Sequence, residues 1–348
     1  MRILFGIQGT GNGHIVRSRE VVRHLKSKGH DVRIIFSGRK PVLLKEFTDL
    51  EPSRYLQGLT FSTCEGRIRY FKSVIHLNIF RLYRDIYSFD ASDLDLVITD
   101  YEPISARIAS RRHLPSIGIG HQYAFCYRIP VAGDNFFTKW MLLHFAPAQY
   151  PLGLHWHHFS QPILPPIVPR SAKRSKAPKM EKILVYLPFE SLPEIRALFR
   201  AVKTHHFFIY TTIEHAEDDG NLHLRPISRS SLLLDLADCS GVISNAGFEL
   251  AGEALHLGIK ILAKPLSGQL EQASNAMALS ALGWGSVMKD LEQKAVEEWL
   301  GKPQNEPAGY PDTAKMIADW IEDGNWEDIE GLSQKAWSKT RFGTPLSL

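Results

Sequence analysis

The chain has 348 residues, about twice the usual size of one domain, so we expect two domains. Apolar residues make up 44% and charged residues 22%, values that exclude a disordered, collagen-like or coiled-coil protein. The three cysteines lie far apart, which argues against a disulfide framework or a CxxC metal site and favours a cytoplasmic location.

The net charge of +4 is unevenly distributed along the chain. Residues 1–160 carry 21 Lys and Arg against 13 Asp and Glu, whereas residues 183–348 carry 14 against 23. The stretch 161–182 is rich in proline and lysine, which predicts an interdomain linker. We therefore expect a basic first domain (1–160) and an acidic second domain (183–348) with different partners. No signal peptide or membrane-spanning helix is expected, because no suitable apolar run is long enough.

Both halves alternate short apolar strands with amphipathic helices. In the first half, the predicted strands cover residues 3–7, 31–37, 95–99 and 117–120, with a helix over 15–28. In the second half, strands are predicted at 182–187, 207–211, 241–244 and 260–263, with helices at 191–203, 247–257 and 269–282. This alternation is typical of α/β domains with a doubly wound parallel sheet. We therefore predict two Rossmann-like domains that face each other across a cleft.

Two segments do not follow this alternation. Residues 140–169 contain no Asp, Glu, Lys or Arg but hold six prolines and four histidines. We interpret this stretch as a buried or cleft-facing loop, and not as a metal site, despite the cluster of His155, His157 and His158. Residues 67–87 show helical periodicity with a basic face, which predicts either a core-packed helix or one that lies on anionic lipid.

Three glycines follow the first strand and open the next helix, namely Gly9, Gly11 and Gly13. One interpretation is a dinucleotide site, in which Arg39 and Lys40 meet a 2′-phosphate. The other is a tight turn below a cleft, with His14 pointing into it. The spacing GxGxGH, in place of GxGxxG, favours the second interpretation.

A second set of polar residues begins where the strand 241–244 ends. The next helix is opened by Asn245, Ala246, Gly247 and Phe248. Backbone N–H groups at a helix N-terminus suit a diphosphate. Glu253, further along this helix, is placed to bind ribose hydroxyls, and the pair Glu271–Gln272 offers donors and acceptors for sugar hydroxyls.

This segment resembles the nucleotide-sugar signature of GT-B glycosyltransferases. The nearest are the MurG-like N-acetylglucosaminyltransferases and a poorly characterised bacterial and archaeal MurG-like group, with UDP-glucuronosyl and plant UDP-glycosyltransferases more distant. The family pattern is matched by Gly247, Glu253, Pro265, Glu271–Gln272 and Asn275–Ala276, and the N-terminal loop by Gly9, Gly11, Gly13 and His14. The resemblance implies a UDP-sugar donor, no metal cofactor and inversion at the transferred sugar.

The chain departs from the family pattern in two places. Asn245-Ala246-Gly247 stands where UDP-glycosyltransferases usually have His-x-Gly, so the phosphate contact of that histidine is not carried over. The glycine-rich second loop of the peptidoglycan enzymes is missing, which puts a lipid-linked acceptor in doubt.

Transfer to a hydroxyl needs a base near the acceptor oxygen. Four titratable residues are expected at the carboxyl ends of strands in the first domain, namely His14, Asp100, Glu102 and His121. We predict His14 as the base because an imidazole titrates near neutrality, with Asp100 as its partner, as the resemblance to the plant enzymes also implies. Glu102 or His121 is the reserve base or an acceptor contact. The alternative for Asp100 is an N-cap ahead of Pro103.

No metal site is predicted, because the literal DxD motif, Asp93-Leu94-Asp95, precedes its strand and so lies at the opposite edge of the sheet. Two other functions stay open at this point: a UDP-sugar 2-epimerase on the same scaffold, and a nucleotide-sugar-binding protein without catalysis. From the charge distribution we expect an acceptor that is anionic or presented at a membrane, with residues 67–87 contributing. A nucleic-acid acceptor is not favoured, because no reader motif is present.

Overall fold

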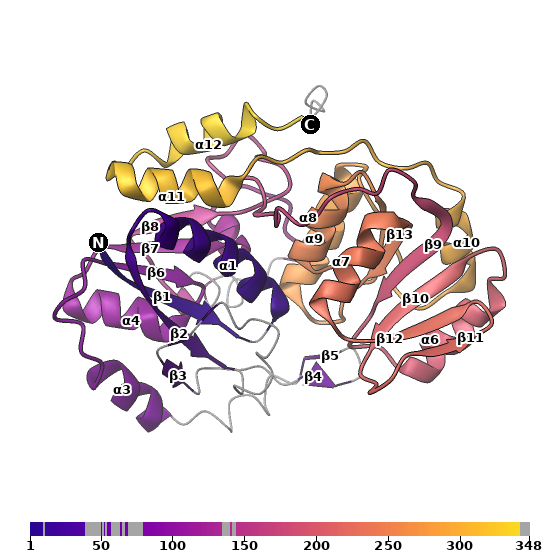
Figure 1. The fold of residues 1–348 in the computed structure, drawn as a ribbon, viewed down its shortest axis with the longest axis horizontal. Helices are drawn as coiled ribbons and strands as arrows, with labels where there is room; N and C mark the ends of the chain where they lie inside the picture. Colours follow the sequence, from indigo (N-terminus) through magenta and orange to yellow (C-terminus); the bar gives the residue numbers. More distant parts are fainter. Residues whose placement is uncertain are drawn as a thin grey trace.

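The computed structural model describes residues 1–9, 11–38, 50, 52, 54–56, 63–64, 67–68, 79–133, 140 and 144–341. Two lobes, each built on its own sheet, lie side by side (Figure 1). The dinucleotide interpretation rests on Arg39 and Lys40, which lie outside the described residues.

The first lobe contains a six-stranded sheet in the order β3-β2-β1-β6-β7-β8, in which every paired neighbour is parallel. Its strands are β1 (Arg2–Gln8), β2 (Asp31–Ser37), β3 (Arg54–Leu56), β6 (Leu96–Asp100), β7 (Ser116–Gly120) and β8 (Tyr150–Gly153). Its helices include α1 (Asn12–Ser27), α3 (Ile79–Tyr87), α4 (Pro103–Arg112) and the 3₁₀ helix η2 (His121–Cys126). The central strands are apolar throughout because helices cover both faces of the sheet.

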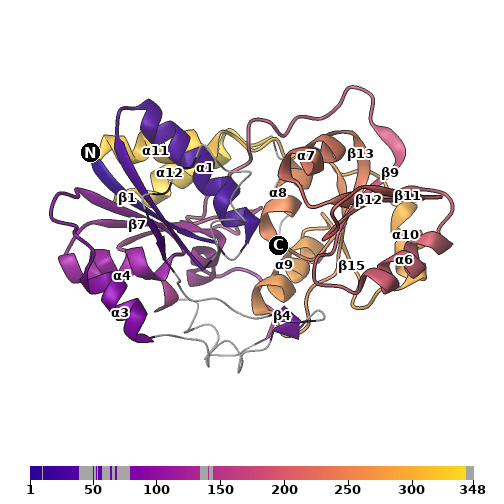
Figure 2. The same cartoon turned by 60° about the horizontal axis from the view of Figure 1, so that its bottom comes forward.

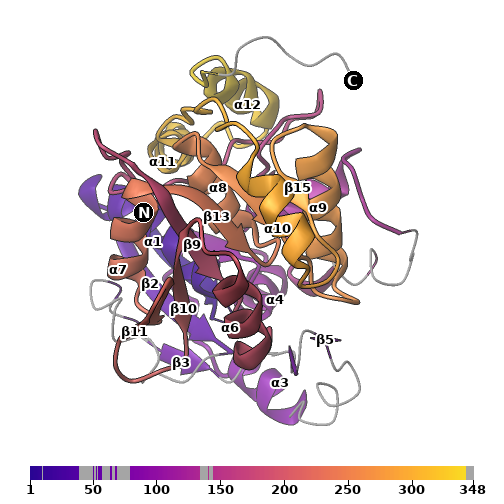
Figure 3. The ribbon, with the colours of Figure 1, turned by 90° about the vertical axis from the view of Figure 1, so that its right-hand side faces the viewer.

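The second lobe contains a seven-stranded sheet in the order β11-β12-β10-β9-β13-β14-β15, parallel except for the edge strand β11. Its strands are β9 (Lys179–Tyr186), β10 (His206–Thr211), β11 (Glu217–Asp219), β12 (Leu222–Pro226), β13 (Cys239–Ser244), β14 (Lys260–Ala263) and β15 (Ser286–Val287). Its helices are α6 (Leu192–Ala201), α7 (Arg229–Asp238), α8 (Phe248–His256), α9 (Leu270–Ala281) and α10 (Gln293–Leu300). Helices α6 and α10 cover one face of this sheet, and α7 and α8 the other (Figure 3). The doubly wound α/β prediction is confirmed for both lobes.

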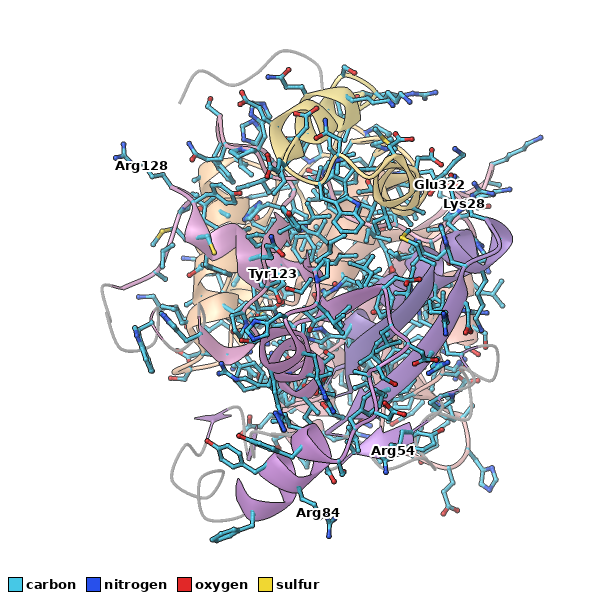
Figure 4. The ribbon with its side chains drawn as sticks, turned by 90° about the vertical axis from the view of Figure 1, so that its left-hand side faces the viewer. Lys28, Arg54, Arg84, Tyr123, Arg128 and Glu322 are labelled. Carbon is cyan, nitrogen blue, oxygen red and sulfur yellow. The ribbon has the colours of Figure 1, made fainter. Side chains whose placement is uncertain are left out.

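The end of the chain returns to the first lobe. Helices α11 (Thr313–Asp323) and α12 (Ile329–Trp337) lie over α1 and β8, away from the rest of the second lobe (Figure 1). Lys28 at the end of α1 forms ion pairs with Asp319 and Glu322 of α11, and Lys28 and Glu322 lie side by side in Figure 4. Residues 183–348, predicted to form one domain, are therefore shared between both lobes.

Residues 144–182, in the proline-rich region, form more regular structure than the predicted loop and linker. It holds the edge strand β8, and Leu164 N donates a hydrogen bond to Gly153 O at 2.8 Å. Ile163 and Leu164 are fully buried, so the beginning of the predicted linker belongs to the core. Because β9 begins at Lys179, the end of the predicted linker belongs to the second sheet.

The predicted helix over 67–87 is wrong at its start. Arg67–Ile68 is the short strand β5, paired antiparallel with β4 (Thr63–Cys64), and the helix α3 begins only at Ile79. The residues 69–78 between them lie outside the described part of the chain. Helical periodicity was misleading here, because a pattern of apolar residues does not show that Arg67–Ile68 pairs with the preceding strand, Thr63–Cys64.

Candidate active site

Several of the predicted site residues, among them His14, Asp100 and His121, lie where the two lobes touch. The N-terminal end of α1 approaches α8 and α9 of the other lobe (Figure 2). Since the carboxyl ends of β1, β6 and β7 lie at the same edge of the first sheet, the loops that follow them all face this contact. The site is therefore built from strand ends in one lobe and helix beginnings in the other.

His14 and Asp100 form the expected pair. His14 lies in the first turn of α1, and Asp100 is the last residue of β6. His14 Nδ1 is 2.7 Å from Asp100 Oδ1, and the side chain of His14 is 14% exposed whereas that of Asp100 is 1% exposed. The alternative role of Asp100 as a helix cap is wrong, because the N-cap of α4 is Glu102.

Arg17 completes this pair and was missed in the sequence. Its Nε donates to Asp100 Oδ2 at 2.9 Å, its Nη2 donates to Asp100 Oδ1, and its Nη1 donates to Glu249 of α8. Ser18 Oγ also donates to Asp100 Oδ2, at 2.6 Å. Burial raises the pKa of Asp100, but the charges of Arg17 and His14 and their hydrogen bonds outweigh it and hold this pKa below its usual value.

A signal for Arg17 did exist in the sequence. Arg17 follows His14 by three residues, so both side chains lie on one face of a helix that starts at the glycine loop. The position of Arg17, about one helical turn after the candidate base His14, therefore indicated that it could pair with the carboxylate of Asp100. Its second partner, Glu249, had no sequence signal, since it comes from the other lobe.

Glu102 is not a base in the cleft, contrary to the prediction. It is fully buried and caps α4: its carboxylate accepts hydrogen bonds from Ile104 N at 2.9 Å and Ser105 N at 2.6 Å. Burial raises the pKa of Glu102, and the bonds from the backbone N–H groups act against this rise. Pro103 at the first position of the helix marked the helix start correctly, but the cap is the residue directly before it.

His121 and Asn275 bond to each other across the lobes. His121 Nε2 lies 2.7 Å from Asn275 Oδ1, and its Nδ1 lies 2.9 Å from Leu154 O. The ring stacks on Phe248, with centroids 4.1 Å apart. Both side chains are fully buried, so the predictions of His121 as a reserve base and Asn275 as a donor ligand do not match this arrangement. They form an interlobe contact instead.

The glycine loop and the start of α8 face each other, as expected for loops that approach a ligand. A Cβ atom at Gly13 would overlap the carboxylate of Glu249, so a side chain there would displace this carboxylate from its present position. Gly11 has no such neighbour. On the opposite side, Gly247 is the N-cap of α8 and makes no side-chain cap, which leaves the first N–H groups of the helix to other acceptors.

Asn245 links two neighbouring loops, those that contain Glu190 and Lys264, through its side-chain amide. Its Nδ2 donates to Glu190 Oε1 at 3.1 Å and to Lys264 O at 2.9 Å, while Lys264 Nζ forms an ion pair with Glu190 at 2.8 Å. Ala246, the next residue, accepts a hydrogen bond from Asn275 Nδ2 through its carbonyl oxygen at 3.0 Å. Beside these loops lies a cavity of about 930 Å³ lined by residues that include Glu190, Lys264, Leu266 and Gly268. It is large enough for a nucleoside.

Glu253 does not present a free carboxylate to this cavity. It is 1% exposed, and both of its oxygens accept hydrogen bonds from Arg229, the first residue of α7, one of them at 3.0 Å. A ribose would have to displace this guanidinium, so the assignment of Glu253 to ribose binding is not supported by the geometry.

We expect Glu253→Ala to destabilise the protein instead of acting mainly on nucleotide binding. Removing one partner of a buried ion pair costs about 3–5 kcal/mol, because the other charge loses its partner there. Urea denaturation should show a loss in this range, and Glu253→Gln, which keeps one oxygen and the volume, should lose less. A variant as stable as the wild type but with weaker nucleotide binding would restore the ribose assignment.

Glu271 and Gln272, the predicted acid–amide pair, make different contacts. Gln272 Oε1 accepts a hydrogen bond from Leu266 N at 2.9 Å and so shapes the loop after β14. Glu271 Oε2 accepts from Gln122 Nε2 of the first lobe at 3.1 Å. Gln122 is 6% exposed, and its amide oxygen has no hydrogen-bond partner among the described residues. Glu271 is partly exposed, and Gln122 contacts it from the other lobe.

Other chemical motifs do not converge on the cleft. Asp95 Oδ2 accepts from Arg2 N at 2.6 Å, and Asp93 pairs with Arg33, so the DxD motif lies at the amino ends of the strands, as predicted. The described residues contain no group of three or more His, Cys, Asp or Glu side chains placed to hold a metal ion. His155 is buried among aromatic rings, and burial lowers its pKa.

Two Rossmann-like lobes whose strand ends and helix starts face each other define the fold of a GT-B glycosyltransferase. The chain belongs to the family described as glycosyl transferase family 1, whose sequence model matches residues 1–303. The protein is accordingly a glycosyltransferase, which confirms the resemblance found in the sequence.

Individual relatives are distant. A UDP-N-acetylglucosamine–N-acetylmuramyl-(pentapeptide) pyrophosphoryl-undecaprenol N-acetylglucosamine transferase of Brucella anthropi is 32% identical over 103 residues, which cover 25% of this chain and 28% of that protein. The glycotransferase of kitacinnamycin has a TM-score of 0.61 at 15% identity, with 96% of this chain and 97% of that chain covered. For MurG of Acinetobacter baumannii the TM-score is 0.53 at 14% identity, with 97% and 95% covered. These structures share the fold with the chain.

Proposed function

We propose that this glycosyltransferase transfers a sugar from a UDP-sugar to an acceptor hydroxyl, with inversion and without a metal ion, and that His14 is the general base. The observation that carries this proposal is the His14–Asp100 pair, 2.7 Å apart, which faces the start of α8 across the cleft. A base in one lobe opposite an anion-binding helix end in the other is the arrangement that a displacement at a sugar carbon needs.

The donor is assigned to the second lobe. The cavity beside Lys264 and Leu266 takes the nucleoside, and the N–H groups that follow Gly247 take the diphosphate, supported by the helix dipole. Glu271 and Gln122 accept hydrogen bonds from hydroxyls of the transferred sugar. The partial match to a UDP-N-acetylglucosamine-dependent transferase supports UDP over other nucleotides.

The reaction is a single displacement. His14 Nε2 takes the proton of the acceptor hydroxyl as its oxygen attacks the anomeric carbon, and Asp100 stabilises the resulting imidazolium. The bond from the anomeric carbon to the diphosphate oxygen breaks, and UDP leaves with this electron pair. Because attack and departure occur on opposite faces of the sugar, the anomeric configuration inverts. The helix N-terminus stabilises the charge that develops on the diphosphate.

Binding and turnover separate this proposal from its rivals. Thermal shift with UDP, dTDP and GDP should show the largest rise in melting temperature with UDP, because a ligand that binds only the folded state stabilises it. UDP-sugars incubated with candidate acceptors should then release UDP. Conversion of the sugar without UDP release would identify a 2-epimerase, and binding without turnover a nucleotide-sugar-binding protein. Stabilisation by dTDP or GDP alone would refute the UDP donor.

The acceptor is assigned to the basic lobe. No helix among the described residues is long and apolar enough to cross a membrane. On α3, Phe80 is 90% exposed and Tyr83 and Tyr87 more than half exposed, and Arg84 projects outward from the same helix (Figure 4). Exposed aromatic rings beside a cation suit a peripheral contact with an anionic membrane surface. We therefore propose an anionic or membrane-presented acceptor, and a cytoplasmic location stays a prediction from the cysteine content.

Neutralising Arg67, Arg69 and Lys72 together should raise the KM for the acceptor and flatten its salt dependence, while the KM for the donor stays the same. Charges of this kind attract anionic partners over a Debye length of about 10 Å at 0.1 M salt. The structure does not describe the side chains of these three residues. Steady-state kinetics at several salt concentrations test the effect, and acceptor kinetics that ignore both changes would refute an anionic acceptor.

A further inference from the structure

Arg17 is the most deeply buried cation at the cleft, with a side chain that is 2% exposed. It donates to Asp100 of its own lobe through two nitrogens and to Glu249 of the other lobe through the third. Burial lowers the pKa of Arg17, but the charges of both carboxylates raise it above its usual value. One positive charge thus serves two carboxylates, one beside the proposed base and one across the lobe contact.

Asp100 needs this cation to stay ionised. Its carboxylate is buried, and burial alone favours the protonated acid. A protonated Asp100 would offer a weaker acceptor to His14 and no charge to stabilise an imidazolium. Besides His14 and Arg17 on α1, two further titratable groups face Asp100: Tyr123 on η2 and, behind Arg17, Glu249. Burial raises the pKa of Tyr123, and the negative charge of Asp100 raises it further. Among these groups, only Arg17 carries a permanent positive charge.

The charge of Asp100 bears on the tautomer of His14, because an ionised carboxylate can only accept a hydrogen bond. Asp100 Oδ1 receives both His14 Nδ1 and Arg17 Nη2, and these two nitrogens lie 2.6 Å apart. With its hydrogen on Nδ1, His14 donates to Asp100 and keeps a lone pair on Nε2, which a base requires. Should Asp100 lose its charge, the hydrogen would move to Nε2 and the base would be lost.

We propose that Arg17 is a positioning residue that keeps the His14–Asp100 pair in its base-competent state, and that Glu249 of the other lobe holds the Arg17 guanidinium in place. This inference rests on the proposed role of His14. It extends the site to a buried residue that is not among those lining the cavity proposed for the nucleotide.

The test is the pH profile of Arg17→Gln. Without Arg17, burial raises the pKa of Asp100 by up to a few units, so the acid limb of kcat should move to higher pH. We expect kcat to fall about tenfold to a hundredfold at pH 6 and to recover to within about threefold of the wild type at pH 9, while the donor KM stays the same. Arg17→Lys, which keeps the charge, should restore much of the loss and serves if the glutamine variant fails to fold.

Three controls separate positioning from structure. Arg23→Gln removes an arginine from the same helix, where its side chain is 48% exposed and paired with Glu20, and should change nothing. Glu249→Gln should lower kcat less than Arg17→Gln and leave the acid limb in place, because Asp100 keeps its partner. In an Asp100→Asn background, Arg17→Gln should add little further loss. Losses that multiply, or that are equal at every pH, would overturn the proposal.

A measurement on the ligand-free protein keeps this proposal separate from the function. Nitrogen NMR of the histidine rings, with His14 assigned by His14→Gln, should show its hydrogen on Nδ1 in the wild type near pH 7. The Arg17→Gln protein should lose this state at the same pH. A wild-type His14 with its hydrogen on Nε2 would refute the positioning role, whereas absent transferase activity alone would refute the proposed function.

Discussion

Replacing His14 with alanine should lower kcat by about 10²–10⁴-fold, the usual contribution of a general base. The imidazole is the one member of the pair that is partly exposed, at 14%, so it can reach an acceptor hydroxyl, whereas Asp100 cannot. Donor affinity should change little, because the cavity proposed for the nucleotide lies in the other lobe. Steady-state kinetics and a UDP titration together measure both expectations.

The matched control for this change is His113→Ala, on the exposed C-cap of α4, at the end of that helix away from Asp100. It should leave kcat as it is. His14→Ala with near-wild-type turnover would remove the imidazole from the mechanism, and the base would have to be sought among the carboxylates of the second lobe, starting with Glu249 and Glu271.

Glu102→Ala should lower the free energy of unfolding by about 3–5 kcal/mol. The carboxylate of Glu102 caps two backbone N–H groups at the start of α4 in a fully buried place. Each buried donor left without an acceptor costs about 1–3 kcal/mol, and the removed side chain leaves a cavity as well. Urea or thermal denaturation measures the loss in free energy of unfolding.

Glu102→Gln separates the cap from a catalytic role. The amide oxygen keeps one acceptor and nearly the full volume, so this variant should be clearly more stable than Glu102→Ala and retain kcat. If the glutamine variant folds normally but loses turnover by orders of magnitude, Glu102 has a chemical role that its buried cap position does not explain.

The sequence alone determined the architecture. Short apolar runs and the period-3.6 pattern located the central strands and helices of both lobes, since the middle of a strand buried between helices must be apolar. It also brought His14 and Asp100 together, because carboxyl ends of neighbouring parallel strands share one edge. Their chemical roles remain predictions.

Only the tertiary structure decided which polar side chains stay free for a ligand. Glu253 and Asn275 fit the family pattern by spacing, yet Arg229 and His121 occupy them. The second partner of Arg17 is Glu249, which lies 232 residues away in the chain and in the other lobe. Spacing along a chain records which side chains share an element, whereas the partner of a buried polar group depends on which elements meet. That choice is made by packing, because burial without a partner is what costs free energy.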